Sequence, residues 1–178
     1  CHKATPRIQD DDVFAPILLG SQFASDKLKE EFRDDYWDCK GKNIGRLHPY
    51  CAELTAIYWA WKHYAELGDP DYIGLFHYRR FLNFGESIPE IDLWKCAFFD
   101  FSLRTRRRFG WDEQIILKYC QGSDIVLPCR EKILDPYDWK TPTTLETHYK
   151  HSHYPEDFDI TRDYIKTNIP EYAQAAME

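Results

Sequence analysis

The feature that most constrains the fold is an expected helix followed, after a tight turn, by a short apolar strand. The helix is predicted from Pro49 to about Leu67, because apolar residues recur there at spacings of three and four. Gly68 ends the helix, and the following Asp69-Pro70 turns the chain. Residues 71–76 then form an apolar run with β-branched and aromatic members, which is typical of a buried strand. The predicted buried face of the helix comprises Leu54, Ile57, Tyr58, Trp61, Tyr64 and Ala65.

A second helix and strand follow the same order further along the chain. The helix is predicted from Trp111 to Gln121, and residues 124–128 form the next apolar run. Helices that alternate with strands favour an α/β fold, with a mostly parallel sheet flanked by helices. We also expect an edge strand within 13–20, a surface helix within 26–36, a loop over 37–48 and an irregular segment over 83–110. The chain is expected to be a single domain over 1–178, with a helical C-terminal part at 142–178.

Composition excludes several classes of protein. The 178 residues carry a net charge of −7, which argues against a general nucleic-acid binder. The sequence has no apolar run of the roughly 18 residues that a membrane helix needs, and no signal peptide. Its six cysteines stand at irregular spacings without a C-x-x-C pair, which indicates reduced thiols in a cytoplasmic protein.

The expected strand at 71–76 runs directly into His77, Tyr78, Arg79 and Arg80. In an open α/β sheet, ligands bind outside the carboxyl ends of the strands. Because the planar arginine guanidinium matches phosphate oxygens, this strand end predicts a phosphate-bearing ligand such as a nucleotide-sugar. Arginines that pair with surface carboxylates are an equally good explanation of the strand end taken alone.

Three segments in this order and spacing resemble one protein family. They are Asn43-Ile44, the helical stretch from Tyr50 to Lys62 with its Glu-Leu-Thr-Ala sequence, and the stretch from Asp71 to Arg80 with its His-Tyr-Arg-Arg ending. The family is a domain of unknown function in bacterial capsular and exopolysaccharide biosynthesis proteins, treated as glycosyltransferases, with a galactofuranosyltransferase-like member. The resemblance implies a nucleotide-binding fold of the GT-A or Rossmann-like type. Family members extend further at both ends, so the chain is expected to be incomplete there.

The resemblance implies roles for the charged residues. Arg79 and Arg80, with His2 and Lys3, are predicted to bind the donor phosphates, where positive charge stabilises a leaving diphosphate. Glu53 and His77 are the candidate catalytic residues, since a carboxylate or an imidazole can accept the proton of an acceptor hydroxyl. Structural alternatives stay open, namely a Glu53–arginine pair and a hydrogen-bonding role for His77.

Four further residues are candidates for substrate binding: Asn43, Thr55, Trp59 and Tyr78. Asn43 could equally stabilise a turn, and Thr55 could cap the helix. Trp59 lies off the predicted apolar stripe and is expected to stack on a sugar, whereas Tyr58 and Trp61 are expected in the core.

The sequence gives no confident metal site, although Mg²⁺ or Mn²⁺ on a diphosphate is possible chemistry for such a protein. Asp69-Pro70-Asp71 has an Asp-x-Asp pattern but precedes its strand, and Asp10-Asp11-Asp12 is interpreted as a solvated run. His148, His151 and His153 lack an evident fourth zinc ligand, and a local interaction of His153 with Asp157 is favoured.

The prediction is therefore a cytoplasmic glycosyltransferase. It would move a sugar from a nucleotide-sugar donor to a bacterial capsule, exopolysaccharide or O-antigen chain, on a polysaccharide or lipid-linked acceptor. The basic cluster at Arg104 and 106–108 suggests a peripheral contact with the inner membrane, and an exposed loop is the alternative. Two other functions are a non-catalytic carbohydrate- or nucleotide-binding module and a phosphate-ester hydrolase, and the second should need a metal.

Overall fold

The structure is a computed structural model that describes residues 13–77, 80–85, 101–128 and 132–176. The chain divides into two compact units, Cys1–Leu127 and Pro128–Glu178. The single domain over 1–178 stays a prediction, and each unit is described by itself.

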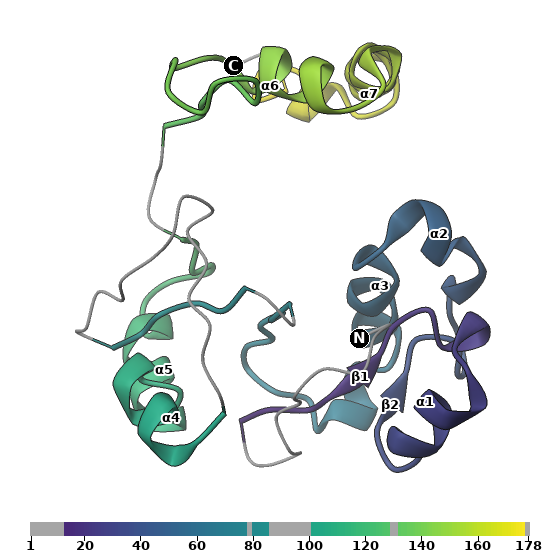
Figure 1. The fold of residues 1–178 in the computed structure, drawn as a ribbon, viewed down its shortest axis with the longest axis vertical. Helices are drawn as coiled ribbons and strands as arrows, with labels where there is room; N and C mark the ends of the chain where they lie inside the picture. Colours follow the sequence, from purple (N-terminus) through teal and green to yellow (C-terminus); the bar gives the residue numbers. More distant parts are fainter. Residues whose placement is uncertain (1–12, 78–79, 86–100, 129–131, 177–178) are drawn as a thin grey trace. The chain divides into compact units, whose positions relative to one another are not determined.

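The first unit contains a small parallel sheet of two short strands within the described residues. Strand β1, Ile17–Leu18, pairs with β2, Tyr36–Trp37, in the register Ile17 to Tyr36 and Leu18 to Trp37. The 3-10 helix η1, Ser21–Phe23, and helix α1, Asp26–Glu31, connect the two strands, as Figure 1 shows. A parallel pair needs such a crossover connection. The buried apolar residues of this part are Leu18, Leu28 and Phe32.

The long helix expected from Pro49 to Leu67 is broken into pieces. The 3-10 helix η2, Gly45–Leu47, leads into α2, His48–Cys51. Ala52 then interrupts the helix with φ 42° and ψ −121°, before α3, Leu54–Lys62, and η3, Tyr64–Leu67. The loop predicted over 37–48 therefore also holds part of β2 and the start of α2.

The predicted buried face of this helix is wrong. Leu54 is 58% exposed and Trp61 is 64% exposed, whereas Thr55, Ala56, Trp59 and His63 are buried. Both faces carry large apolar side chains, so periodicity alone did not distinguish them. Trp59 is held on the inside by hydrogen bonding and ring stacking, because its indole Nε1 donates to the Lys40 carbonyl at 3.0 Å and its ring stacks on His63.

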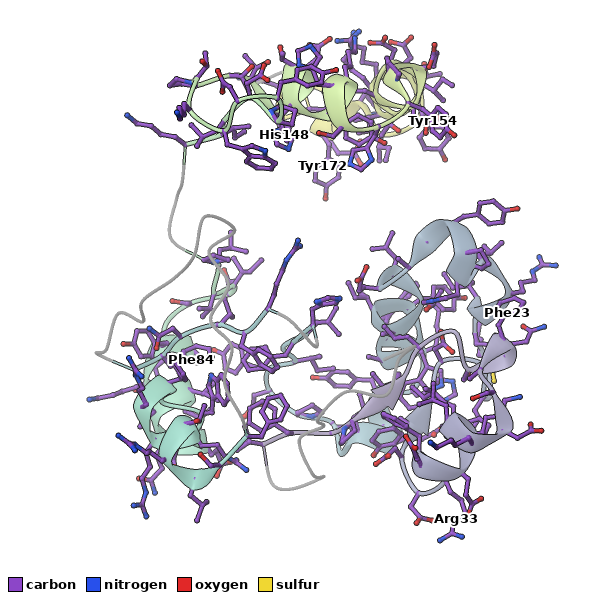
Figure 2. All side chains as sticks on the ribbon, in the orientation of Figure 1. Phe23, Arg33, Phe84, His148, Tyr154 and Tyr172 are labelled. Atoms are coloured by element: carbon purple, nitrogen blue, oxygen red, sulfur yellow. The ribbon has the colours of Figure 1, made fainter. Side chains whose placement is uncertain are left out.

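An aromatic cluster forms the other core of the first unit. Helix α4, Leu103–Phe109, begins after Ser102, and α5, Glu113–Cys120, begins after Asp112; both preceding side chains accept a backbone N–H of the first turn. Part of the segment predicted as irregular is thus helical. The buried rings are Phe84, labelled in Figure 2, Phe109 and Trp111, and they contact Phe14, Phe76, Phe81, Leu82, Phe101, Ile116 and Val126.

The apolar runs at 71–76 and 124–128 were predicted as strands, and neither belongs to a ladder in the described structure. Phe76 and Val126 contact the aromatic cluster, while Ile73, Leu75, Ile125 and Leu127 are exposed. An apolar run shows a tendency toward burial but does not specify a pairing partner. The mostly parallel sheet is confirmed only as a small parallel pair in a mixed helical and sheet fold.

The second unit is helical, as predicted for the C-terminal part. Helix α6, Leu145–Ser152, follows Thr144, whose hydroxyl caps it by accepting the Thr147 N–H. Helix α7, Pro155–Asn168, and the 3-10 helix η4, Pro170–Tyr172, each begin at a proline, a residue that suits the first helical turn. Lys150 joins the two helices through Glu146 on α6 and Asp159 on α7. Through the described ranges, no helix is long and apolar enough to cross a membrane.

A glycine in the aromatic core gives a test of this fold. A Cβ added to Gly85 would lie 2.1 Å from the Arg108 carbonyl oxygen, whereas one added to Gly74 meets nothing within 4 Å. Gly85→Ala must displace the backbone of α4, so we expect it to lower the free energy of unfolding by about 1–3 kcal/mol. Urea denaturation measures this, with Gly74→Ala as the control; equal stability of the two variants would contradict the packing of residue 85 against α4.

Candidate functional site

A fully buried carboxylate, that of Asp38, lies where three segments of the first unit meet. Its Oδ1 accepts hydrogen bonds from the Ser21 backbone N–H at 3.0 Å and from the Ser21 hydroxyl at 2.6 Å. Its Oδ2 accepts from the Gly20 N–H at 2.9 Å and from the Thr55 hydroxyl at 2.7 Å. Because four donors converge on two acceptor oxygens, the arrangement is that of an ionised carboxylate.

The Asp38 network fixes the start of α3. Thr55, fully buried, lies in the first turn of this helix, and its hydroxyl also lies 3.0 Å from the Ala52 carbonyl oxygen. The His48 ring of α2 approaches from the other side of the break, with its Nδ1 3.4 Å from the Thr55 hydroxyl and 3.9 Å from Asp38 Oδ2. The network therefore joins both sides of the break to the end of β1 and to the residue after β2.

The break presents Glu53 at the N-terminus of α3. The positive φ of Ala52 is unfavourable for an L-residue and costs about 1–3 kcal/mol. Such strain occurs often where a backbone is held in place for function. The Glu53 carboxylate follows this strained residue directly, and 46% of its side chain is exposed.

The structure brings the two predicted catalytic residues together. Glu53 Oε1 lies 3.2 Å from His77 Nε2, and 17% of the His77 side chain is exposed. With its Nε2 proton in place, the imidazole donates to the carboxylate and fixes its orientation. In such a pair the carboxylate can accept a proton from a substrate hydroxyl while the imidazole keeps it in position.

His77 and Arg80 form a short antiparallel main-chain bridge. The His77 N–H donates to the Arg80 carbonyl at 3.1 Å, and the Arg80 N–H donates to the His77 carbonyl at 3.0 Å. The Arg80 side chain is exposed. Two backbone hydrogen bonds therefore join Arg80 to His77, whose ring contacts the Glu53 carboxylate.

Three of the predicted substrate-binding residues have structural contacts. The Asn43 amide donates to the Cys39 and Gly41 carbonyls and its oxygen accepts the Gly45 N–H, which is the turn-stabilising alternative. Thr55 is fully buried and hydrogen-bonded to Asp38, and Trp59, 2% exposed, contacts the rings of Tyr36 and His63. Their burial disfavours direct contact of Thr55 or Trp59 with a sugar, and no comparison tests these roles.

Other predicted site residues lie outside the described residues. These are His2, Lys3, Tyr78 and Arg79, together with Asp10-Asp11-Asp12. Their predicted roles stay predictions.

In the described ranges, no group of three or more His, Cys, Asp or Glu side chains could hold a metal ion. The histidines of the second unit have other contacts. His148 Nδ1 lies 2.7 Å from the Leu134 carbonyl, His151 Nδ1 lies 3.4 Å from Asp135 Oδ2, and the His153 ring lies on that of Tyr149. The prediction of Mg²⁺ or Mn²⁺ stays untested.

Sequence reasoning missed Asp38, Ser21 and His48. These residues lie in a predicted loop or near the ends of short elements, without a periodic pattern or a motif. Their importance depends on contacts between positions 17 and 18 residues apart, such as Asp38 with Thr55 and with Gly20. A buried acid followed at a distance by Thr and His is not a signal that one sequence reveals.

Comparisons with known proteins agree with the resemblance. A family model described as "Domain of unknown function (DUF4422)" matches residues 1–178. A solved structure described as the apo form of WbbM, a bifunctional glycosyltransferase, matches with a TM-score of 0.75 and 27% sequence identity. That match covers 98% of this chain and 29% of the WbbM chain, so the chain spans less than a third of the length of this relative. No curated protein matches the sequence significantly.

The buried network predicts a large effect of one substitution. Asp38→Asn replaces one acceptor oxygen by an N–H₂ group, which is itself a donor and would face the N–H and O–H donors of the network. We therefore expect the free energy of unfolding to fall by about 2–4 kcal/mol. Asp34→Asn is the matched control, because the Asp34 side chain is 86% exposed and pairs with the exposed side chain of Arg33. Urea denaturation compares the two, and a loss below about 0.5 kcal/mol for Asp38→Asn would contradict the network.

Proposed function

Because the chain belongs to the DUF4422 family of domains of unknown function, and its fold resembles part of a glycosyltransferase, we propose that it is a glycosyltransferase domain of the GT-A or Rossmann-like type. It would move a sugar from a nucleotide-sugar to a bacterial surface polysaccharide, in a capsule, an exopolysaccharide or an O-antigen. The observation that carries this proposal is the contact between Glu53 and His77, whose main chain is hydrogen-bonded to that of Arg80.

The proposed chemistry is a displacement at the anomeric carbon of the donor. The acceptor hydroxyl attacks this carbon while its proton passes to the Glu53 carboxylate, which His77 orients. The bond from the anomeric carbon to the phosphate oxygen breaks, and the electron pair leaves with the nucleoside diphosphate. Positive charge at Arg80, and at Arg79 as predicted from the sequence, stabilises the oxygen on which negative charge develops.

The acceptor, the cellular location and any divalent ion belong to the proposal too. The acceptor would be a growing polysaccharide or a lipid-linked glycan, at the cytoplasmic face of the inner membrane. Helix α4 carries exposed Arg104, Arg107 and Arg108, which supports a peripheral contact with anionic lipid. The alternative function, a binding module without turnover, would use the same phosphate contacts.

Nucleotide binding gives the first test. The thermal unfolding temperature of the chain is measured with UDP, GDP, CMP and dTDP and their sugars, with and without Mn²⁺. We expect stabilisation by one nucleotide class, because a ligand that binds only the folded state raises the unfolding temperature. A Mn²⁺ requirement for that shift would identify metal-assisted binding, and no shift with any nucleotide would contradict the proposed donor site.

Arg80→Ala tests the phosphate contact. The loss of a charge-assisted hydrogen bond is expected to weaken nucleotide binding about 10- to 100-fold in calorimetry. Arg33→Ala is the control, since Arg33 forms an exposed pair with Glu30. If both variants bind as the unsubstituted chain does, Arg80 does not contact the phosphates.

Glu53→Gln tests the catalytic role. Removal of the proton acceptor should lower the rate of nucleoside diphosphate release from the donor sugar about 10²- to 10⁴-fold, while nucleotide affinity is retained. Glu66→Gln is the matched control, because Glu66 also contacts a histidine, with its Oε1 2.7 Å from His63 Nδ1. An unchanged rate in Glu53→Gln would assign the base elsewhere, and binding without turnover in the unsubstituted chain would favour the binding module.

A further inference from the structure

The segment before α6 in the second unit forms a closed loop. The Asp135 N–H donates to the Thr141 carbonyl at 2.8 Å, and the Thr143 N–H donates to the Ile133 carbonyl at 2.9 Å. Leu134 and Pro142 form an antiparallel bridge between these bonds. The two ends of the loop are therefore held together by main-chain contacts, which fixes its base.

Two aspartates hold the inside of this loop. Asp138 Oδ1 accepts the N–H groups of Lys140 and Thr141 at 2.8 and 2.9 Å, and its Oδ2 accepts the Thr141 hydroxyl at 2.5 Å. These bonds, first that of the Thr141 hydroxyl, lower the pKa of the Asp138 carboxyl to about 2. Since the pKa of Asp138 is lower in the folded state, its ionised carboxylate stabilises the fold. This stabilisation is complete above the ordinary pKa of 3.8 and is lost as the pH falls toward 2. Asp135 Oδ1 likewise accepts the Tyr137 N–H at 2.9 Å.

This fixed backbone presents two aromatic rings to the surface. Tyr137 is 76% exposed and Trp139 is 47% exposed. Each ring contacts a histidine of α6: Tyr137 lies 4.8 Å from the ring centre of His151, and Trp139 meets His148 edge to face at 6.0 Å. Three residues apart, the two histidines lie on one face of the helix, and His148 is labelled in Figure 2.

The histidines are themselves held by the loop. The His148 Nδ1–H donates to the Leu134 carbonyl at 2.7 Å, and His151 Nδ1 lies 3.4 Å from Asp135 Oδ2. The loop and α6 thus fix one another, and the two histidines of α6 contact the rings of Tyr137 and Trp139. These histidine contacts reduce the conformational freedom that the two rings lose when a ligand binds, which favours binding.

Trp139 has a backbone conformation that its side chain makes unfavourable. Its φ is 55°, in the left-handed region that glycine or asparagine normally takes, and its N–H donates to the Asp135 carbonyl at 2.8 Å. A glycine would close the same turn without strain. The presence of a large, half-exposed ring at this position indicates that the ring has a use that a smaller residue would not serve.

We propose that residues 135–141, with the α6 histidines behind them, form a binding site for hexose units of the glycan acceptor. The flat faces of Tyr137 and Trp139 match the C–H face of a pyranose ring, and the rim suits sugar hydroxyls. Polar groups adjoin the rings: Asp135 accepts the Tyr137 N–H and contacts His151, and Thr141 is exposed, which is more polar than an apolar protein partner or lipid chains would require. The identity of the ligand as an acceptor rests on the proposed function; its identity as a glycan does not.

Saturation-transfer NMR on the complete chain tests the site without any nucleotide. The probes are maltotetraose and β-1,4-galactotetraose, whose C–H protons receive saturation when they lie on an aromatic ring. We expect transfer to the sugar protons with the unsubstituted chain, and a decrease of at least about fivefold in Tyr137→Ala and in Trp139→Ala. Tyr154→Ala is the matched control, because Tyr154 is 77% exposed in the same unit but lies outside the loop.

Trp139→Gly separates binding from folding. Glycine removes both the ring and the unfavourable φ, so the variant should unfold cooperatively and still lose saturation transfer. Equal transfer in the unsubstituted chain and in Trp139→Gly, or no transfer from either sugar, would overturn the proposal. The nucleotide panel is a separate measurement on the unsubstituted chain, so a failure of the donor site there leaves the glycan result standing, and the reverse also holds.

Discussion

The first unit depends on one buried ionic group, the carboxylate of Asp38. An isolated charge in the interior would be costly, and the cost is offset only when donors satisfy both of its oxygens. Here the donors come from the end of β1, from η1 and from the start of α3, so the same group that needs them also fixes these segments relative to one another. The strained Ala52 backbone and the outward position of Glu53 follow from this anchoring, because Thr55 must reach Asp38 only three residues after the helix breaks.

The sequence predicted the helical segments better than the strands. Helices at 26–31, 54–62, 113–120, 145–152 and 155–168 lie within or near the predicted segments, because local periodicity and capping residues such as Ser25 and Thr144 determine them. The runs at 71–76 and 124–128 have strand composition, yet a strand exists only with a partner. Pairing depends on distant residues, so composition does not give it, and within the described residues neither run is paired with another strand.

The buried face of α3 shows a second limit. Leu54, Ile57 and Trp61 have the spacing of a core stripe, but the structure buries Thr55, Ala56 and Trp59 instead. The choice follows from the Asp38–Thr55 bond and from the Trp59–Lys40 bond, which connect residues 17 and 19 positions apart. A helical pattern gives the period of a helix, but polar contacts over such distances decide which face turns inward.

Residue chemistry and the family resemblance predicted Glu53, His77 and Arg80 as site residues. The fold places the Glu53 and His77 side chains in contact and joins the main chain of His77 to that of Arg80, and the roles of these residues stay predictions. Neither could predict the support beneath them, since Asp38, Ser21 and His48 belong to no motif. The Glu53–His77 pair lies at the surface, and the buried Asp38 network fixes the start of the helix that carries Glu53. The closed loop before α6 follows the same principle on a smaller scale, with Asp135 and Asp138 fixing two exposed rings.

Backbone amide NMR during titration with UDP, GDP, CMP and dTDP tests directly whether Glu53, His77 and Arg80 form the donor site. We expect one nucleotide to shift the amides of Glu53, His77 and Arg80 more than those of α6 and α7. Shifts that are confined to other segments, or absent with all four nucleotides, would contradict it.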